Sequence, residues 1–158
     1  MELIVVLVLL GLSISLITPS LSQFSKSVEL KASTKRVAAI LRYGRSEAIN
    51  KGKVYQILFD SNLKEVKIQS MEPAASEEEK SGERREAKGV QKTFALPSDV
   101  QIKEVKVEST QYPSDLPAVE FYPNGGSNGG NILLDTLNHK GYKIKIHFLT
   151  GTVAIEKV

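Results

Sequence analysis

The chain has 158 residues, of which 41% are hydrophobic and 25% charged, an ordinary globular composition with one modest core. Its 21 Lys and Arg residues against 18 Asp and Glu residues give a net charge of +3, too small a surplus to indicate nucleic acid as a partner. Because there is no Cys and there are only 2 His, composition excludes disulfide frameworks, zinc ribbons and thiol nucleophiles and disfavours a transition-metal cage.

The first segment of the chain is almost entirely apolar and is predicted to lie in a lipid bilayer as a helix. The residues that make it so are Leu3, Ile4, Val5, Val6, Leu7, Val8, Leu9, Leu10, Gly11, Leu12, Ile14, Leu16 and Ile17. At 1.5 Å per residue this segment reaches roughly 22 Å, short of the ~30 Å hydrocarbon core. About four further apolar residues would complete the span.

A cleaved signal peptide is an alternative for the same segment, with Ser20-Leu21-Ser22 as its cleavage site. Signal peptides begin with basic residues, whereas this segment begins with Glu2. An acid at this end of the segment is costly in lipid unless it is neutralised or paired with a cation. Glu2 therefore indicates a function in the membrane, and the simpler alternative is an acid that reaches headgroup water.

A helical pattern continues beyond the apolar segment. Apolar and small residues recur three, four or seven positions apart at Leu30, Val37, Leu41, Gly44 and Ala48. We therefore expect one long helix, with residues 1–22 as its membrane half and 23–52 as its soluble half. Pro19 removes a backbone donor and is expected to bend the helix, and Gly52 is expected to end it.

The soluble half of this helix is rich in cations. Together with the residue that follows its expected end, it carries Lys26, Lys31, Lys35, Arg36, Arg42, Arg45, Lys51 and Lys53, against Glu29 and Glu47. Such a surface can contact anionic headgroups or an acidic patch on another subunit. Because the charges are scattered around the helix, a solvated face is the simpler interpretation.

From residue 54 onward the apolar pattern has a period of two, which predicts strands. The expected strands are 54–60, 65–70, 93–97, 100–108, 118–122, 132–135, 142–149 and 152–158. Hairpin turns are expected at 60–62 and at Thr150-Gly151, and a β-bulge at Lys103-Glu104. A helix followed by strands indicates an α+β fold, in which the helix packs on a mainly antiparallel sheet formed within residues 53–158.

The sequence makes two further predictions for the β domain, one for the strand 142–149 and one for residues 72–89. In the strand 142–149, Tyr142, Ile144, Ile146 and Phe148 alternate with polar residues and are expected to face the core. Residues 72–89 are dense in both charges and lack apolar periodicity, so we expect an exposed, mobile insertion there.

The glycine-rich stretch 121–130, FYPNGGSNGG, has the glycine spacing of a phosphate-binding loop between Gly125 and Gly130. A phosphate-binding loop needs a Lys after its last glycine, and Asn131 occupies that position. The missing Lys excludes a nucleotide site of this kind. Glycines that allow a positive φ at a tight connection between strands explain the composition without a ligand.

Residues for catalysis or for a cofactor are not evident in the sequence. His139 lies in a predicted turn and His147 on the polar face of a predicted strand, and neither has an adjacent Ser or Asp that indicates a triad. The acids Asp60, Asp99, Asp115 and Asp135 are predicted at turns or strand ends, without the run of oxygen ligands that calcium needs. The sequence therefore predicts no enzyme, no cofactor and no metal site.

Glu2 followed by LIVVLVLLGL, with Pro19 further on, resembles the amino-terminal helix of type IV pilins and type II secretion pseudopilins. The resemblance implies that a leader and the first mature residues precede Met1, where a prepilin peptidase cuts and methylates the new terminus. It also implies that Glu2 meets the free amine of a neighbouring subunit in lipid and so sets the axial register of assembly.

Three further segments are similar to the GspH/FimT group of minor pseudopilins and pilins. They are Arg45-Ser46-Glu47-Ala48-Ile49, the F-x-P-x-G-x-S-x-G-G pattern of Phe121, Pro123, Gly125, Ser127, Gly129 and Gly130, and the closing LTGTV around Gly151. DNA-binding members of the group carry arginines beside this closing glycine, whereas Thr152, Val153 and Ala154 follow it here. DNA is therefore disfavoured as a partner.

The resemblance implies a minor pseudopilin similar to the H component of type II secretion. Such a protein is a single-pass protein of the bacterial inner membrane with a periplasmic β domain, and it enters the periplasmic pseudopilus on assembly. Its expected partners are other minor and major pseudopilins, the inner membrane and a secreted substrate. The alternatives are a minor pilin of a type IV pilus, in contact with DNA, and a secreted soluble binding domain with a cleaved signal peptide.

Overall fold

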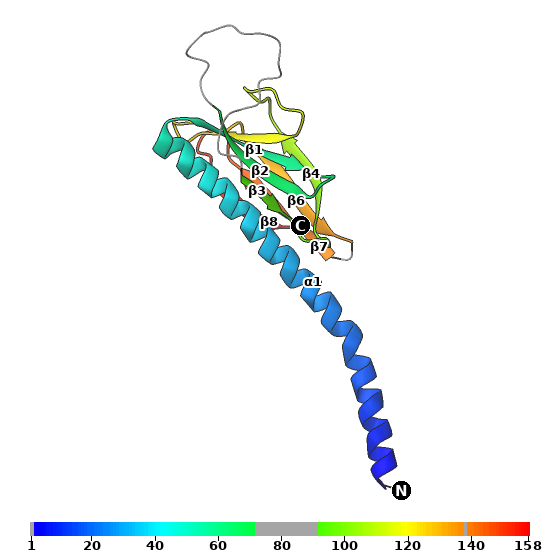
Figure 1. Ribbon diagram of the computed structural model, residues 1–158. Helices are drawn as coiled ribbons and strands as arrows, with labels where there is room; N and C mark the ends of the chain where they lie inside the picture. Colours follow the sequence, from blue (N-terminus) through cyan, green and yellow to red (C-terminus); the bar gives the residue numbers. More distant parts are fainter. Residues whose placement is uncertain (1, 72–91, 138) are drawn as a thin grey trace.

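The computed structural model describes residues 2–71, 92–137 and 139–158, which form one long helix and two antiparallel sheets. Figure 1 shows the helix running from the N-terminus along one side of a compact β domain. The elements are α1 (Glu2–Lys51), β1 (Val54–Asp60), β2 (Glu65–Met71), β3 (Lys92–Ala95), β4 (Gln101–Val107), β5 (Ala118–Phe121), β6 (Gly130–Thr136), β7 (His139–Ile146) and β8 (Val153–Lys157). The expected α+β fold is confirmed, and the expected insertion at 72–89 lies outside the described residues.

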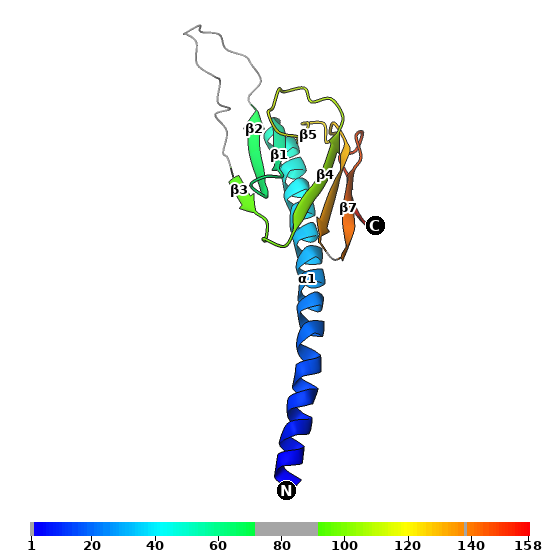
Figure 2. The same cartoon turned by 90° about the vertical axis from the view of Figure 1, so that its right-hand side faces the viewer.

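The strands form two four-stranded sheets instead of one continuous sheet. One has the order β3-β2-β1-β5 and the other the order β4-β6-β7-β8, and all neighbours are antiparallel. The two sheets lie side by side along the helix (Figure 2). The division arises because β1 pairs on both of its edges, with β2 and with the distant β5, which leaves β4 to pair with β6.

The C-terminal half of α1 is held by its apolar stripe. Leu30, Val37, Leu41 and Ala48 are each no more than 1% exposed, as the helical spacing predicts. The helix ends at Lys51, and Gly52 follows in the left-handed conformation with a φ of 63°, the usual role of glycine after a helix. The predicted end of the helix is therefore confirmed.

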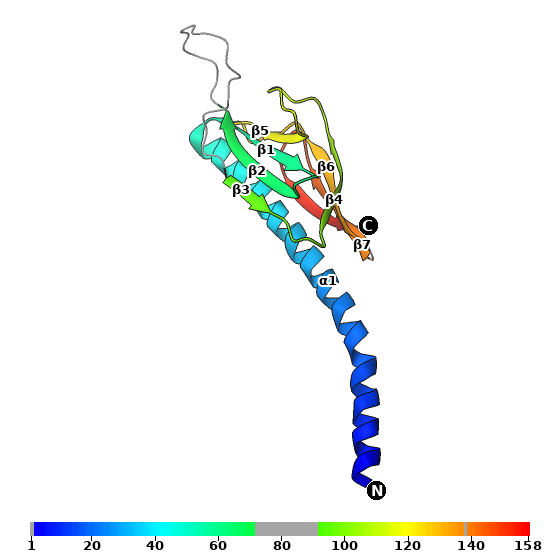
Figure 3. The ribbon, with the colours of Figure 1, turned by 45° about the vertical axis from the view of Figure 1, so that its right-hand side comes forward.

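The N-terminal half of α1 projects beyond the β domain (Figure 3). Its side chains from Leu3 to Leu10 are each more than half exposed, although all of them are large and apolar. The helix continues through Pro19 and changes direction in its blue first part (Figure 1). Within the part of the chain whose side chains the structure describes, no helical stretch combines the length and apolarity needed to cross a bilayer.

The predicted bulge and the first hairpin are confirmed by the pairing of the strands. In β4 the register with β6 shifts between Ile102 and Glu104, so Lys103 is the extra residue. In the turn between β1 and β2, Asp60 Oδ1 accepts hydrogen bonds from the backbone N–H groups of Asn62 and Leu63 at 3.0 and 2.9 Å. Local turn chemistry thus sets the register of this hairpin.

The predicted strand 142–149 is too long at its end. β7 ends at Ile146, because Gly151 N donates to His147 O at 2.7 Å and His147 N donates to Thr152 O at 3.0 Å, which closes a turn over residues 147–152. Phe148 is therefore 53% exposed at this turn and not in the core. Ile144 and Ile146 are buried as expected, and Tyr142 packs against the core from its edge.

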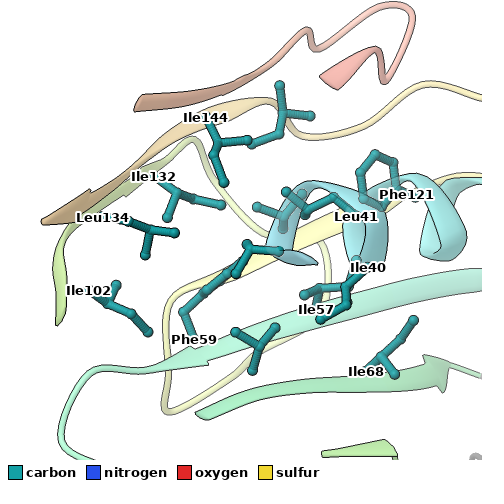
Figure 4. Packing of buried hydrophobic residues seen from close by; sticks show 14 of the residues in the cluster. Ile40, Leu41, Ile57, Phe59, Ile68, Ile102, Phe121, Ile132, Leu134 and Ile144 are labelled. Carbon is teal, nitrogen blue, oxygen red and sulfur yellow. The ribbon is translucent and has the colours of Figure 1, made fainter. Parts of the chain in front are cut away.

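One hydrophobic core joins the helix and both sheets (Figure 4). Phe59 comes from the first sheet, Ile132 and Leu134 come from the second, and Leu41 comes from α1, all with no exposed surface. At about 25 cal/mol per Å² of apolar surface, burying side chains of this size stabilises the fold by about 1.5–3 kcal/mol each. The helix is therefore part of the β domain's core and not an appendage to it.

Gly44 of α1 lies directly against the side chain of Ile57 in β1. A Cβ at this position would lie 2.6 Å from Ile57 Cδ1. We expect Gly44→Val to lower the free energy of unfolding by about 1–3 kcal/mol, because the added carbons must displace a fully buried side chain. Thermal unfolding measures the change, and Ala39→Val on the exposed face of the same helix is the control. Equal unfolding temperatures for the two variants would contradict the prediction.

Candidate functional site

The three motif segments of the sequence meet at Arg45, near the C-terminal end of α1. The Arg45 Nε–H group donates to the backbone oxygen of Gly125 at 3.1 Å and to that of Thr150 at 2.9 Å. Gly125 lies in the connection between β5 and β6, and Thr150 lies in the turn between β7 and β8. A single guanidinium thus ties the end of the helix to the connection between the two sheets and to a turn of the second sheet.

The glycines of this junction are explained by close contact between backbones. Gly151 has a φ of 60°, and a Cβ there would lie 2.5 Å from Gly125 O and 3.0 Å from Arg45 Nε. Gly130 has a φ of 142°, and a Cβ there would lie 2.5 Å from Lys106 O in β4. Both positions therefore require glycine for packing, as expected from the sequence, and the glycines are explained without a phosphate.

The rest of the glycine-rich segment closes onto the β7–β8 turn. Ser127 N donates to Phe148 O at 2.8 Å, and Gly129 N donates to Ser127 Oγ at 2.9 Å. Phe121 is fully buried in the core, and the exposed Pro123 begins a turn in which Gly125 N donates to Tyr122 O at 2.9 Å. These motif residues build the loop, and none of them presents a reactive group to solvent.

The residues that follow Arg45 in the helical motif lie outside the contact with the two loops. Ala48 is buried in the core, while Ser46 is exposed and accepts a hydrogen bond from Asn50 Nδ2 at 3.3 Å. Glu47 pairs with Lys51 at 2.6 Å, and this bond is the main reason that the pKa of the Glu47 carboxyl lies below, and the pKa of Lys51 above, its ordinary value. The helical motif thus splits into a junction residue, a core residue and a surface ion pair.

A buried carboxylate that no sequence pattern indicates lies in β5. Glu120 has no exposed surface and accepts hydrogen bonds from Gln111 N at 2.8 Å, Tyr112 N at 2.9 Å and the Tyr122 hydroxyl at 3.1 Å. The side-chain amide of Gln56 in β1 contributes a longer bond of 3.4 Å. These donors satisfy the buried charge without a cation and fasten the segment between β4 and β5 onto the first sheet.

The outer face of the second sheet carries a shallow hollow of about 380 Å³ beside the β7–β8 turn. Gly129 and Ala154 lie among its lining residues, as do His147 and Phe148, whose rings stack at 5.5 Å between centroids. Across residues 2–71, 92–137 and 139–158, no group of three acidic or His side chains is placed to hold a metal ion. Phe148 and Leu149 are exposed on this turn and give it an apolar surface.

The other candidate residues are not brought to this junction. Glu2 is the exposed first residue of α1, at the end opposite Arg45, and its apolar neighbours are likewise exposed. Pro19 belongs to the same helix. Thr152 is exposed and the backbone oxygen of Val153 accepts a hydrogen bond from Arg42 at 3.1 Å, so the positions after Gly151 contribute no cation.

Replacement of Arg45 tests the junction. We expect Arg45→Ala to lower the free energy of unfolding by about 1–3 kcal/mol, because the partly buried backbone oxygen of Gly125 and the exposed one of Thr150 lose their donor. At about 2–4 °C per kcal/mol for a domain of this size, thermal unfolding resolves the change. Arg36→Ala, at an exposed position of the same helix, is the matched control. A loss no larger than that of the control would show that the two loops do not depend on Arg45.

The Glu120 cluster predicts a shifted titration. Burial, followed by the charge of Glu120 and its hydrogen bond, raises the pKa of Tyr122 to about 12, from an ordinary value of 10.0. The unfolded chain therefore loses this proton first, and stability falls as the pH rises from about 10 towards 12. We expect Glu120→Gln to move the Tyr122 pKa part of the way down, as NMR titration of isotope-labelled tyrosines would measure. The control Glu108→Gln changes an exposed carboxylate and should leave it in place.

Comparison with known proteins gives one consistent group. The family model described as Type II transport protein GspH matches residues 33–150, which include Arg45 and the whole glycine-rich segment. The chain is 26% identical over 153 residues to type II secretion system protein H of Xanthomonas campestris pv. campestris, covering 97% of this chain and 78% of that protein. The matched region contains the C-terminal part of α1 and the strands β1 to β7.

Solved structures share the fold. The minor pseudopilin EpsH of the Vibrio cholerae type 2 secretion system has a TM-score of 0.57 at 10% identity, covering 80% of this chain and 94% of that chain. The type IV minor pilin FimU of Pseudomonas aeruginosa has a TM-score of 0.58 at 17% identity, covering 84% of this chain and 92% of that chain. At these identities the likeness concerns the fold. The match of the family model over well over half of the sequence establishes that the chain belongs to the GspH family of type II transport proteins.

Proposed function

We propose that this chain is a minor pseudopilin, a structural subunit of the type II secretion pseudopilus that assembles with other minor and major pseudopilins. The observation that carries the proposal is the GspH match over residues 33–150, within which separate motif segments converge on Arg45. A junction that joins a long helix to the connection between the two sheets and to a turn of the second sheet serves rigidity and assembly. The chain acts as a building element and not as an enzyme.

The N-terminal half of α1 is proposed to anchor the free subunit in the bacterial inner membrane and to pack among neighbouring helices after assembly. Support comes from the exposed side chains between Leu3 and Leu10, which have no partner surface in the described part of the β domain. Burying each such side chain is worth about 1.5–3 kcal/mol, which favours a state in which lipid or other helices cover them. The residues from 53 to 158 then form the periplasmic domain.

Glu2 is proposed to set the axial register. A carboxylate at the apolar end of the helix is costly in lipid unless it meets a cation, and the free amine of the neighbouring subunit supplies one. The carboxylate and the amine can meet only when the two parallel helices have one particular axial offset. The charge therefore specifies the geometry of the assembly more than its strength.

The exposed turn between β7 and β8 is the proposed contact for another minor pseudopilin or for secreted substrate. Phe148 is 53% exposed and Leu149 is 68% exposed, and both stand at the end of the domain where α1 ends. Exposed apolar side chains that neighbour each other on a rigid turn are typical of protein–protein contacts. The Arg45 junction beneath this turn would keep it rigid.

A type IV pilus minor pilin and a secreted soluble domain are the competing functions. The first is favoured only by the likeness of the fold to FimU. Mass spectrometry of the amino-terminal peptide of the natively expressed protein separates the second from a filament subunit. A methylated Phe a few residues ahead of Glu2 is expected, whereas a terminus near Gln23 would overturn both the membrane anchor and the role of Glu2.

Replacement of Glu2 tests the register. We expect Glu2→Ala to reduce incorporation into sheared pseudopili by at least about tenfold, because an amine is left unpaired in lipid. Thermal unfolding of the β domain should not change, because the N-terminal half of α1 lies outside the core. The control Glu108→Ala removes an exposed carboxylate from the β domain. Normal incorporation of Glu2→Ala would refute the proposed register.

A further inference from the structure

Four exposed cations lie on the outer side of the soluble half of α1, opposite its buried stripe, and one of them, Arg42, reaches the edge strand β8. They are Lys31, Lys35, Arg36 and Arg42, and we call this surface the basic face. Residues 30–46 contain no Asp or Glu. Glu29 and Glu47 stand just beyond this range, both half-buried, and Glu47 is already paired with Lys51.

The cations of the basic face lack the carboxylate partners that several other lysines have. Lysines elsewhere form ion pairs with N–O distances between 2.6 and 3.6 Å, namely Lys26–Asp99, Lys51–Glu47, Lys67–Glu65, Lys103–Asp135, Lys106–Glu104 and Lys145–Glu156. Within the described parts of the chain, Lys31, Lys35 and Arg36 form no such pair. Arg42 donates to a backbone oxygen, which leaves its charge uncompensated. Among the described residues Lys64, Lys92, Lys143 and Lys157 also lack a carboxylate partner, but they lie on several strands and turns, whereas the basic face holds four such cations on one helix.

The shape of the basic face suits a flat, anionic surface. At about 100° per residue, Lys31, Lys35 and Arg42 project within about 40° of one another, and Arg36 flanks the other side. The exposed residues between the two flanks include Ala32 and Ala39, which leave the cations as the outermost groups. Long, flexible ammonium and guanidinium groups can then extend beyond the helix backbone towards such a surface.

Because α1 is inclined relative to its first part, the face opposite the sheets points towards the side of the molecule on which the N-terminus lies (Figure 1). Figure 1 shows the helix bending away from the line of its first part, with both sheets above the inclined portion and its opposite face open. If the first part stands in the bilayer, the inclined portion leans over the membrane surface with its basic face downward. The bend lies between the apolar segment and the first of these cations, so both can be engaged together.

We propose that the basic face lies against anionic phospholipid headgroups while the free subunit waits in the membrane. This inference rests on the proposed insertion of the N-terminal half of α1. A negatively charged membrane attracts each nearby Lys or Arg and changes the equilibrium about fivefold per residue. Several cations on one rigid helix act together, and they orient the β domain relative to the membrane before assembly. A neighbouring subunit then has to displace lipid from this face.

A fluorescent probe on the basic face tests the proposal in the full-length protein. The chain has no cysteine, so Ala39→Cys provides a single labelling position at an exposed site. The labelled protein is reconstituted in vesicles of phosphatidylcholine, or of phosphatidylcholine with phosphatidylglycerol, that also carry a headgroup quencher. We expect stronger quenching in the anionic vesicles. The difference should shrink at about 1 M salt, where the screening length falls from about 10 Å to about 3 Å.

Two triple variants with the same net charge separate the basic face from general attraction. The variant Lys31→Gln, Lys35→Gln, Arg36→Gln should lower the ratio of molecules with the basic face against the lipid to molecules with it away from the lipid by at least about tenfold. The control variant Lys103→Gln, Lys106→Gln, Lys145→Gln removes three cations from the second sheet and should retain it. Quenching that does not depend on lipid charge, or that falls equally in both triple variants, would overturn the proposal.

Flotation of the same samples separates this inference from the proposed membrane anchor. Protein that floats with neutral vesicles supports insertion of the helix, and a lack of charge-dependent quenching then overturns the basic face alone. Protein that does not float with any vesicle overturns both. Energy transfer between labelled copies that is independent of lipid charge would assign the face to a protein partner and so also overturn the lipid proposal.

Discussion

The contact between the apolar stripe of α1 and the two sheets is the interaction on which the rest of the domain depends. Val37 and Leu41 lie in the core with no exposed surface, in one cluster with buried side chains from both sheets. Neither sheet could bury its inner face without the helix. The same contact fixes the end of α1 in space, and Arg45 can therefore hold two loops at once.

Local sequence patterns predict the helix and the strands, but they do not predict which distant strands pair with each other. The stripe through Val37, the ends of β1 and the bulge at Lys103 all follow from periods and turn residues within a few positions. The division into two sheets depends on the pairing of Tyr55 with Phe121, which no local pattern encodes. A buried Phe148 is predicted for a related reason, because the apolar period of β7 continues past the residue where the strand ends.

The candidate site is predictable from sequence where its residues match a family motif, and not where a residue depends on partners that are distant in the sequence. Arg45, Gly125 and Gly151 belong to three separate sequence motifs, and the structure brings them within hydrogen-bond or van der Waals distance. Glu120 gives no such signal, because a single carboxylate in a short apolar strand is usually solvent-facing. Its meaning depends on backbone N–H groups of Gln111 and Tyr112, which belong to a segment without periodicity.

The two faces of α1 obey different physical requirements, and this separation explains how one helix can serve both folding and assembly. The inner face tolerates little change, because Gly44 and its neighbours lie in contact with β1. The outer face, with Lys35 and Ala39, contributes little to the core and is free to meet another surface. Side chains such as Leu3 are likewise outside the core. A change on the outer face or in the N-terminal half can therefore alter assembly while the domain stays folded.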